Sequence, residues 1–237
     1  MALPTINTPT YELEIPSTDE KIKYRPFLVK EEKILLLAME SGKQTDVINA
    51  IKQIVTACTF GKLKIGTMPM FDIEYLFLNI RAKSVGEISE LQLVAPDDKE
   101  TTVSVSVDLN DIKVQVQDNH TNKVELTDEM GIYMTYPTVN GFANSGATEV
   151  TAENMLDVIV SCISQIYDKK GEEIFEAKDS TKKELIEFIE QLNSQQFKDI
   201  QNFFDTMPKL KHTIKIKNPK TNVESEVVLS GLSDFFA

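Results

Sequence analysis

An unbroken apolar run stands out in the pattern of hydrophobic and polar positions along this chain. Ile34–Met39 are six consecutive apolar residues. They lie in a predicted helix whose first turn carries Glu31 and Glu32, where carboxylates suit the positive end of the helix dipole, and which Gly42 is predicted to end. A surface helix needs one apolar stripe, so a helix that is apolar on every side should be buried on every side. We expect this segment to be the central helix of the N-terminal part, or a helix that a partner covers.

The flanking pattern predicts further elements in the N-terminal part. Tyr11–Ile15 alternates between apolar and polar residues and predicts a strand, which residues 21–24 could join as the second strand of a hairpin. After the apolar run, Thr45 is predicted to cap a second helix, and Asp72 is a candidate cap of a third. Residues 1–87 therefore predict a hairpin followed by a three-helix unit.

The periodicity changes in residues 88–149. Valines alternate with polar residues over 102–107 and again over 113–117. This period of two is typical of half-buried antiparallel strands. We expect these strands to form one β-region, joined by turns near Asp97 and Asp118, with a loop over 137–149.

Residues 150–206 return to a helical period. A helix capped by Thr151 is predicted to carry its apolar stripe as far as Ile166. Thr181 and Glu184 form a capping-box pattern that opens the next helix, and Ser194 is the candidate cap of a further one.

The last segment predicts a hairpin formed by Thr213–Lys217 and Val223–Leu229. Lys215 and Lys217 share one face of its first strand, within a run of lysines that contains no acidic residue. This face is either a docking surface for an acidic neighbour or a solvated edge strand that lysines protect from aggregation.

The chain closes with Gly231–Phe236, which predicts a short terminal helix or hook. Its apolar residues are Leu232, Phe235 and Phe236. They pack either on the protein's own core or into the pocket of a partner. Together with Lys215 and Lys217, they are the candidate partner-binding residues.

These elements predict an α+β fold in three segments. Residues 1–87 form a helical N-terminal unit that begins with a hairpin, and residues 88–149 form an antiparallel β middle region. Residues 150–237 form a second helical region with a closing C-terminal β-hairpin and the hook. An apolar content of 41% over 237 residues supports a real core.

Composition narrows the classes of function. The net charge of −12 repels phosphate backbones, so nucleic-acid binding by the whole chain is not expected. Residues 1–16 lack the basic and apolar regions of a signal peptide, and no run approaches the length of a membrane span. Cys58 and Cys162 lie in apolar runs and are expected to be free small hydrophobes rather than a disulfide.

No motif indicates a catalytic or metal site. His120 and His212 lie in different predicted β-regions and are expected to be ordinary surface residues. Zinc has no recognisable ligand set, because neither an H-E-x-x-H nor a C-x-x-C motif occurs. Asp97 and Asp98 lack the spacing and central glycine of a calcium loop and are interpreted as turn residues. We therefore expect no catalytic residue, cofactor or metal.

Five segments carry a likeness to a known family. They are LPTINTPTYELEIPST, KYRPFLVKEEKILLLAMES, ACTFGKL, FDIEYLFLNIRAKSVGE and VVLSGLSDFF. These segments resemble the baseplate protein family of T-even-like contractile-tailed bacteriophages. The similarity is densest in residues 1–90 and returns at 209–236, whereas 95–205 carry little of it. The resemblance implies a hub assembly factor or a hub component, and it brings no catalytic residues with it.

We therefore expect a non-enzymatic, chaperone-like baseplate hub assembly protein that binds other hub or tail proteins in the host cytoplasm. The strong net charge suits a soluble protein that holds a partner, and no long fibrous or self-associating element is evident. The alternative is a structural baseplate subunit that stays in the virion tail. A third class, an enzyme such as a lysin or nuclease, would need a cleft of converging carboxylates.

Overall fold

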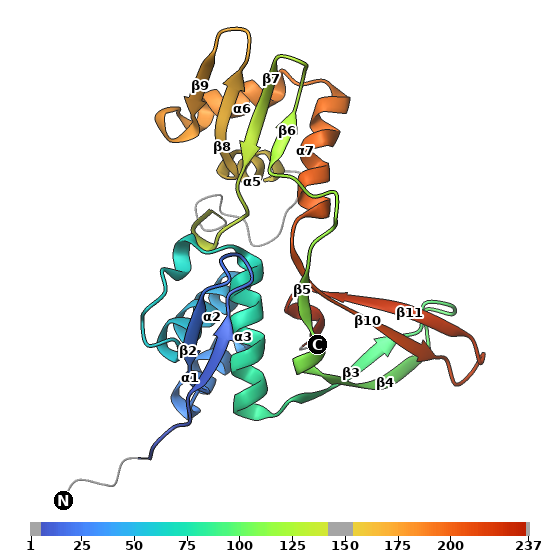
Figure 1. The fold of residues 1–237 in the computed structure, drawn as a ribbon. Coiled ribbons are helices and arrows are strands. Elements are labelled where there is room, and N and C mark those ends of the chain that lie inside the picture. Colours follow the sequence, from blue (N-terminus) through green and yellow to red (C-terminus); the bar gives the residue numbers. More distant parts are fainter. Residues whose placement is uncertain (1–5, 142–153, 236–237) are drawn as a thin grey trace, which may run out of the picture. The chain divides into compact units, whose positions relative to one another are not determined.

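The computed structural model describes residues 6–141 and 154–235, which fold into helices and antiparallel sheets, and so confirms the predicted α+β class (Figure 1). The chain forms two compact units. Unit 1 consists of Met1–Ile65, Phe71–Gln115 and Lys209–Ala237, and unit 2 of Gly66–Met70 and Val116–Pro208. Each of the three predicted segments contributes residues to both units, and their independence as domains stays a prediction.

The N-terminal part of unit 1 contains the predicted hairpin and three helices. Its elements are β1 (Tyr11–Glu14), β2 (Lys21–Tyr24), α1 (Val29–Glu40), α2 (Gln44–Cys58) and, after the short 3-10 turn η1 (Ile65–Thr67), α3 (Met70–Val85). Strands β1 and β2 pair antiparallel. Gly42 has φ +66 and ends α1 as predicted, because glycine enters this left-handed region without steric cost.

The helix buried on most sides is α3, and the prediction that the Ile34–Met39 helix is central was wrong. Tyr75, Leu78 and Ala82 of α3 belong to the core formed with the β-strands of unit 1. Leu76 and Ile80, which lie on another side of α3, are also fully buried. A helix between two bodies of core needs apolar residues around most of its circumference.

Two predicted helix caps in unit 1 were wrong. Asp72 lies inside the first turn of α3, where its buried carboxylate accepts hydrogen bonds from the Ser17 amide (3.1 Å) and hydroxyl (2.5 Å). Burial raises the pKa of Asp72, and the bonds from Ser17 offset part of that rise. The N-cap of α2 is Lys43 rather than Thr45.

The rest of unit 1 is a pair of small sheets. Its elements are β3 (Ile88–Val94), β4 (Thr102–Asp108), η2 (Leu109–Asp111), β5 (Lys113–Gln115), β10 (Lys209–Lys217), β11 (Glu224–Ser230) and η4 (Ser233–Phe235). One sheet is β3-β4 and the other is β11-β10-β5, all antiparallel. The closing hairpin and the antiparallel strands predicted in residues 88–149 are confirmed, and these strands are divided among three sheets.

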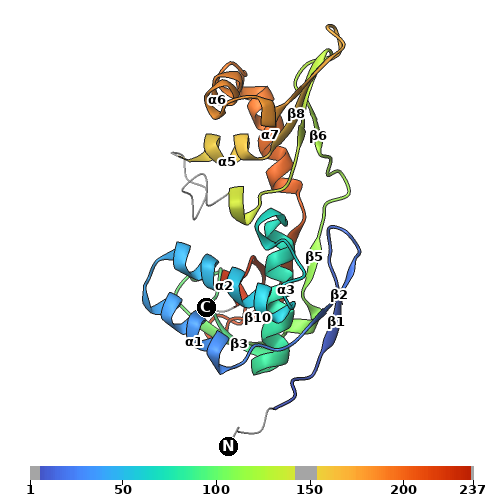
Figure 2. The same ribbon diagram turned by 90° about the vertical axis from the view of Figure 1, so that its left-hand side faces the viewer.

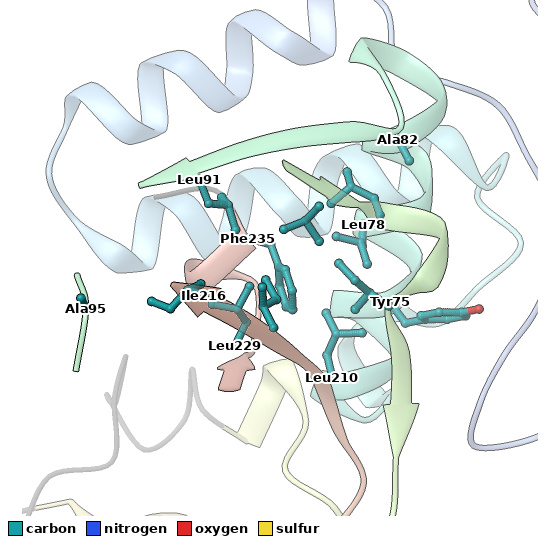
Figure 3. Packing of buried hydrophobic residues seen from close by; sticks show 13 residues of the cluster. Tyr75, Leu78, Ala82, Leu91, Ala95, Leu210, Ile216, Leu229 and Phe235 are labelled. Carbon is teal, nitrogen blue, oxygen red and sulfur yellow. The ribbon is translucent and has the colours of Figure 1, made fainter. Parts of the chain in front are cut away.

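Side chains from both sheets and from α3 fill one apolar core (Figure 3). Strand β3 contributes Leu91, while Ile216 and Leu229 come from the opposite hairpin. Phe235 of η4 lies among these residues with no exposed surface. The chain's last described residue therefore completes the core of unit 1.

The turns of the two long hairpins are tied together. The carboxylate of Asp97, in the β3–β4 turn, accepts hydrogen bonds from the buried Asn218 amide (3.1 Å to each oxygen) and from the Thr221 hydroxyl (2.5 Å). The bonds from Thr221 and Asn218 hold the pKa of Asp97 below its ordinary value. These contacts join segments that are far apart in the sequence.

Unit 2 packs three helices on a four-stranded antiparallel sheet of order β6-β7-β8-β9. Its elements are β6 (Lys123–Glu125), β7 (Met130–Met134), α5 (Met155–Ser161), β8 (Ile163–Asp168), β9 (Glu173–Glu176), η3 (Ala177–Asp179), α6 (Lys182–Glu190) and α7 (Ser194–Thr206). Ile132 of the sheet and Ile189 and Phe203 of the helices are buried in one core.

The helix predicted to run as far as Ile166 was wrong beyond Ser161. Cys162 ends α5, and the next residues form β8, in which Ile166 pairs with Ile132 of β7. Isoleucines suit strands as well as helical stripes, and the pairing with β7 and β9 decides between the two. The predicted cap Thr151 lies outside the described residues.

The capping-box prediction is confirmed in α6. Thr181 accepts a hydrogen bond from the Glu184 amide, and the Glu184 carboxylate accepts one from the Thr181 amide (2.7 Å). In α7 the cap is Asn193 rather than Ser194. The Asn193 side chain accepts hydrogen bonds from the backbone amides of Gln195 and Gln196. Across residues 6–141 and 154–235, no helix is long and apolar enough to cross a membrane.

Candidate protein-docking surface

Helix α1 is anchored at its start by a buried ion pair. Glu31 accepts a hydrogen bond from the Leu28 amide (2.9 Å) and another from the Arg25 guanidinium (2.9 Å). Burial alone would raise the pKa of Glu31, but the bonds from Arg25 and Leu28 outweigh it and lower that pKa. Arg25 also donates to the Pro26 carbonyl. The first turn of α1 is thus held by charge-assisted hydrogen bonds in a largely water-free site.

The inward face of α1 is a single narrow stripe. Glu31 and Ala38 are buried, and Ile34 and Leu35 are partly buried between them. This spacing places all four residues on one side of a helix. The stripe is enough to pack α1 on its neighbour α2.

The outward face of α1 keeps large apolar side chains in solvent. The exposed fraction is 79% for Val29, 54% for Leu36, and 56% for both Leu37 and Met39. Helix α1 lies at the periphery of unit 1 (Figure 2). Monomeric proteins rarely expose a large cluster of apolar side chains, and such a cluster is typical of an interaction site.

This face corrects the prediction that α1 is buried on every side and leaves the second reading, a helix that a partner covers. Helix α1 lies at the edge of unit 1, and the large apolar side chains on its outward face are exposed. The signal was present in the sequence, because Ile34–Met39 holds more apolar residues than one buried stripe can use. What the sequence did not give is which side of the helix faces outward.

The predicted lysine face lies on β10, with Lys215 and Lys217 both exposed. Lys215 is 3.6 Å from Glu226 of β11, and Lys217 has Glu224 as its register partner. Exposed pairs of this kind contribute about 0–1 kcal/mol to stability. The strand that reads as purely basic in the sequence therefore faces carboxylates on its neighbour, and its partner-binding role stays a prediction.

The described apolar residues of the hook pack on the protein's own core. Phe235 is fully buried, Leu232 packs against the same core, and Phe236 lies outside the described residues. The Ser89 hydroxyl donates a hydrogen bond to the Phe235 carbonyl (3.3 Å). The side chain of Phe235 is therefore occupied by its own unit, and the partner-binding role of the hook stays a prediction.

His120 is not the surface residue that was predicted. Its ring nitrogens lie 3.0 Å from the Thr206 hydroxyl and 3.1 Å from the Tyr136 hydroxyl, and its ring packs near Phe203. Burial lowers the pKa of His120, while its contact with Asn122 opposes that shift. This group joins the chain before β6 to the end of α7 and has the character of a structural cluster.

The remaining candidate chemistry gives no site in the described part of the chain. Cys58 and Cys162 are free and buried. Burial raises the pKa of the Cys58 thiol to about 11 and that of Cys162 to about 12. Among residues 6–141 and 154–235, no three His, Cys, Asp or Glu side chains are grouped to hold a metal ion. The expected absence of catalysis and cofactors stays a prediction.

Comparison with known proteins gives one match. A family described as T4 bacteriophage base plate protein matches residues 8–237, nearly the whole chain. The match includes residues 95–205, where the sequence segments showed little resemblance. No curated protein and no solved structure matches.

Proposed function

Because the chain belongs to the T4 bacteriophage base plate protein family, we propose that it is a non-enzymatic, chaperone-like assembly protein of the baseplate hub. Family membership itself supports a role in the tail baseplate and contact with other tail proteins. The proposal adds that this protein holds a hub or tail protein in the host cytoplasm while the tail is built, and that it does so through the outward face of α1.

The exposed apolar face of α1 is the observation that carries the proposal. Burying one large apolar side chain is worth roughly 1.5–3 kcal/mol, so leaving several in water forgoes a large part of a domain's usual stability. At the same time the buried Arg25–Glu31 pair holds the helix in place. A well-anchored helix that presents Leu36, Leu37 and Met39 to solvent is suited to a partner that covers them.

A matched pair of variants tests the use of this face. Leu36→Arg places a charge in the centre of the face, and Val228→Arg makes the same kind of change at an equally exposed apolar residue of β11. Tagged wild type and both variants are expressed during infection, and captured proteins encoded by the same phage genome are identified by mass spectrometry. Circular dichroism confirms folding.

We expect wild type and Val228→Arg to capture the same tail protein, and Leu36→Arg to remain folded but lose at least about tenfold of that capture, since an unpaired charge at a closing interface costs more than 1.4 kcal/mol. Equal capture by all three proteins would refute the role of α1. Leu36→Arg is expected to fold because Leu36 is 54% exposed, so a charge there can stay hydrated in the free protein.

A structural baseplate subunit is the second candidate function, and the family description favours it. In that case the same face would stay covered in the finished tail. Mass spectrometry of purified mature particles separates the two functions. Absence or trace amounts support the assembly protein, whereas stoichiometric presence supports the subunit.

A further inference from the structure

The outward face of α1 has a regular seam. Val29, Lys33, Leu36 and Glu40 follow one another at spacings of four, three and four residues, and all four are exposed. This spacing keeps side chains on one line along a helix and is the seam spacing of two-helix coiled coils. Leu37 lies beside this seam on one side and Met39 on the other.

The charges on the seam have opposite signs and a symmetric placement. The ion pairs of α1 within the described residues involve Glu31, with Arg25 and Lys30 as its partners. Lys33 and Glu40 form no ion pair there. The midpoint between Lys33 and Glu40 falls between Leu36 and Leu37, so reversing the helix about this point exchanges Lys33 with Glu40 and Leu36 with Leu37.

From this symmetry we propose that the outward face of α1 binds the same face of a second copy of this chain, with the two helices antiparallel. A twofold axis between Leu36 and Leu37 puts Lys33 opposite Glu40 of the partner subunit, and the same pair forms a second time. It also places Leu36 against Leu37 of the partner subunit. The inference rests on the proposed function in one respect, that this face is a docking surface.

The dimer is weak and forms before assembly. A helix of twelve residues is about 18 Å long, so two such helices bury less than the roughly 1,600 Å² of a standard stable interface. Each copy also carries a net charge of −12, whose repulsion is screened beyond about 8 Å at physiological salt. Self-association shields the apolar face in the free protein, and a tail protein with a larger interface displaces the second copy.

Charge reversal on the full-length chain tests the pairing directly. Lys33→Glu, Glu40→Lys, the double variant that carries both changes, and the control Val228→Arg are compared with wild type by sedimentation velocity from low to high micromolar concentration. Circular dichroism checks that each protein is folded. We expect wild type and the control to dimerise with the same dissociation constant, and each single charge variant to dimerise about tenfold more weakly, since two attractive pairs become repulsive.

The combination of variants is the decisive measurement. Mixing Lys33→Glu with Glu40→Lys restores both opposite-charge pairs in a mixed dimer, and the double variant restores them in its own dimer. We expect both to regain wild-type affinity. A wild type that stays monomeric at high micromolar concentration, single variants that dimerise normally, or a mixture that does not recover would each overturn the antiparallel pairing.

The outcome also separates this inference from the proposed function. A monomeric wild type combined with loss of tail-protein capture by Leu36→Arg would reject the dimer and keep the docking role. A charge-dependent dimer combined with normal capture by Leu36→Arg would keep the dimer and reject the docking of a tail protein on α1.

Discussion

Phe235→Ala is the substitution whose effect the structure defines best. Phe235 belongs to a short 3-10 turn near the C-terminus, a region that is often dispensable in proteins. Here its ring is fully buried among residues of both sheets and of α3, including Leu78, Leu91 and Leu229 (Figure 3). The substitution therefore removes the centre of the core of unit 1 rather than a surface tail.

The magnitude follows from the burial. Replacing a fully buried phenylalanine by alanine removes its burial free energy and leaves a cavity, which together cost about 3–5 kcal/mol. The Ser230 amide donates a hydrogen bond to Asp234 (2.7 Å), and that contact holds the backbone of the turn in place and limits collapse into the cavity. Since whole domains are stable by only about 5–15 kcal/mol, we expect a large shift in the urea midpoint.

The assay is urea unfolding followed by far-UV circular dichroism, with hydrogen exchange and mass spectrometry to assign the loss to unit 1. Phe175→Ala is the matched control, because Phe175 is 49% exposed on β9 of unit 2. We expect faster exchange around Leu91 and Leu229 in Phe235→Ala only. A stability loss below about 1 kcal/mol, or one no larger than that of the control, would show that the ring is not a core residue. Deleting residues 233–237 should then also leave the protein stable.

Three further expectations concern polar groups. Arg25→Met removes the buried partner of the Glu31 carboxylate and leaves it only the exposed Lys30 (3.5 Å) as an ion-pair partner, so urea unfolding should show a loss of up to about 3–5 kcal/mol, and adding Glu31→Gln should recover part of it. Asn193→Ala removes the cap of α7 and should lower the free energy of unfolding by about 1 kcal/mol, whereas Ser194→Ala should change it little; equal effects would reject the cap assignment. The lowered pKa of His120 means that its neutral form is favoured in the folded state. Its contribution to stability is therefore present above about pH 6.5 and is lost as the pH falls through the folded pKa. Urea midpoints measured at several pH values should show this dependence in wild type and a smaller one in His120→Gln.

The sequence was sufficient to predict the elements whose interacting residues lie close together in the chain. The Thr181–Glu184 capping box formed as predicted, because both partners lie within one helical turn. The hairpin β10–β11 formed around Pro219 because alternation on both sides of a turn selects antiparallel pairing without help from distant residues.

Elements that depend on distant neighbours could not be predicted. Strand β5 pairs with β10, and the Gln115–Lys209 partnership joins residues separated by all of the main part of unit 2. Nothing in residues 113–117 identifies that partner. For the same reason, the sequence could not show that α3 rather than α1 is the buried helix. Both helices are rich in apolar residues, and the strands that bury α3 lie later in the chain.

The order of the segments has a consequence for synthesis on the ribosome. Unit 1 begins at the N-terminus, but its core is closed by β10, β11 and Phe235, which emerge after Val116–Pro208 of unit 2. At usual rates of translation that intervening segment takes roughly 5–20 s to make. During this interval the apolar side of α3 and the β3–β4 hairpin lack their covering sheet. We expect unit 1 to complete its fold only once β10, β11 and Phe235 have been made, so that chains terminated before Lys209 are the species most prone to aggregate.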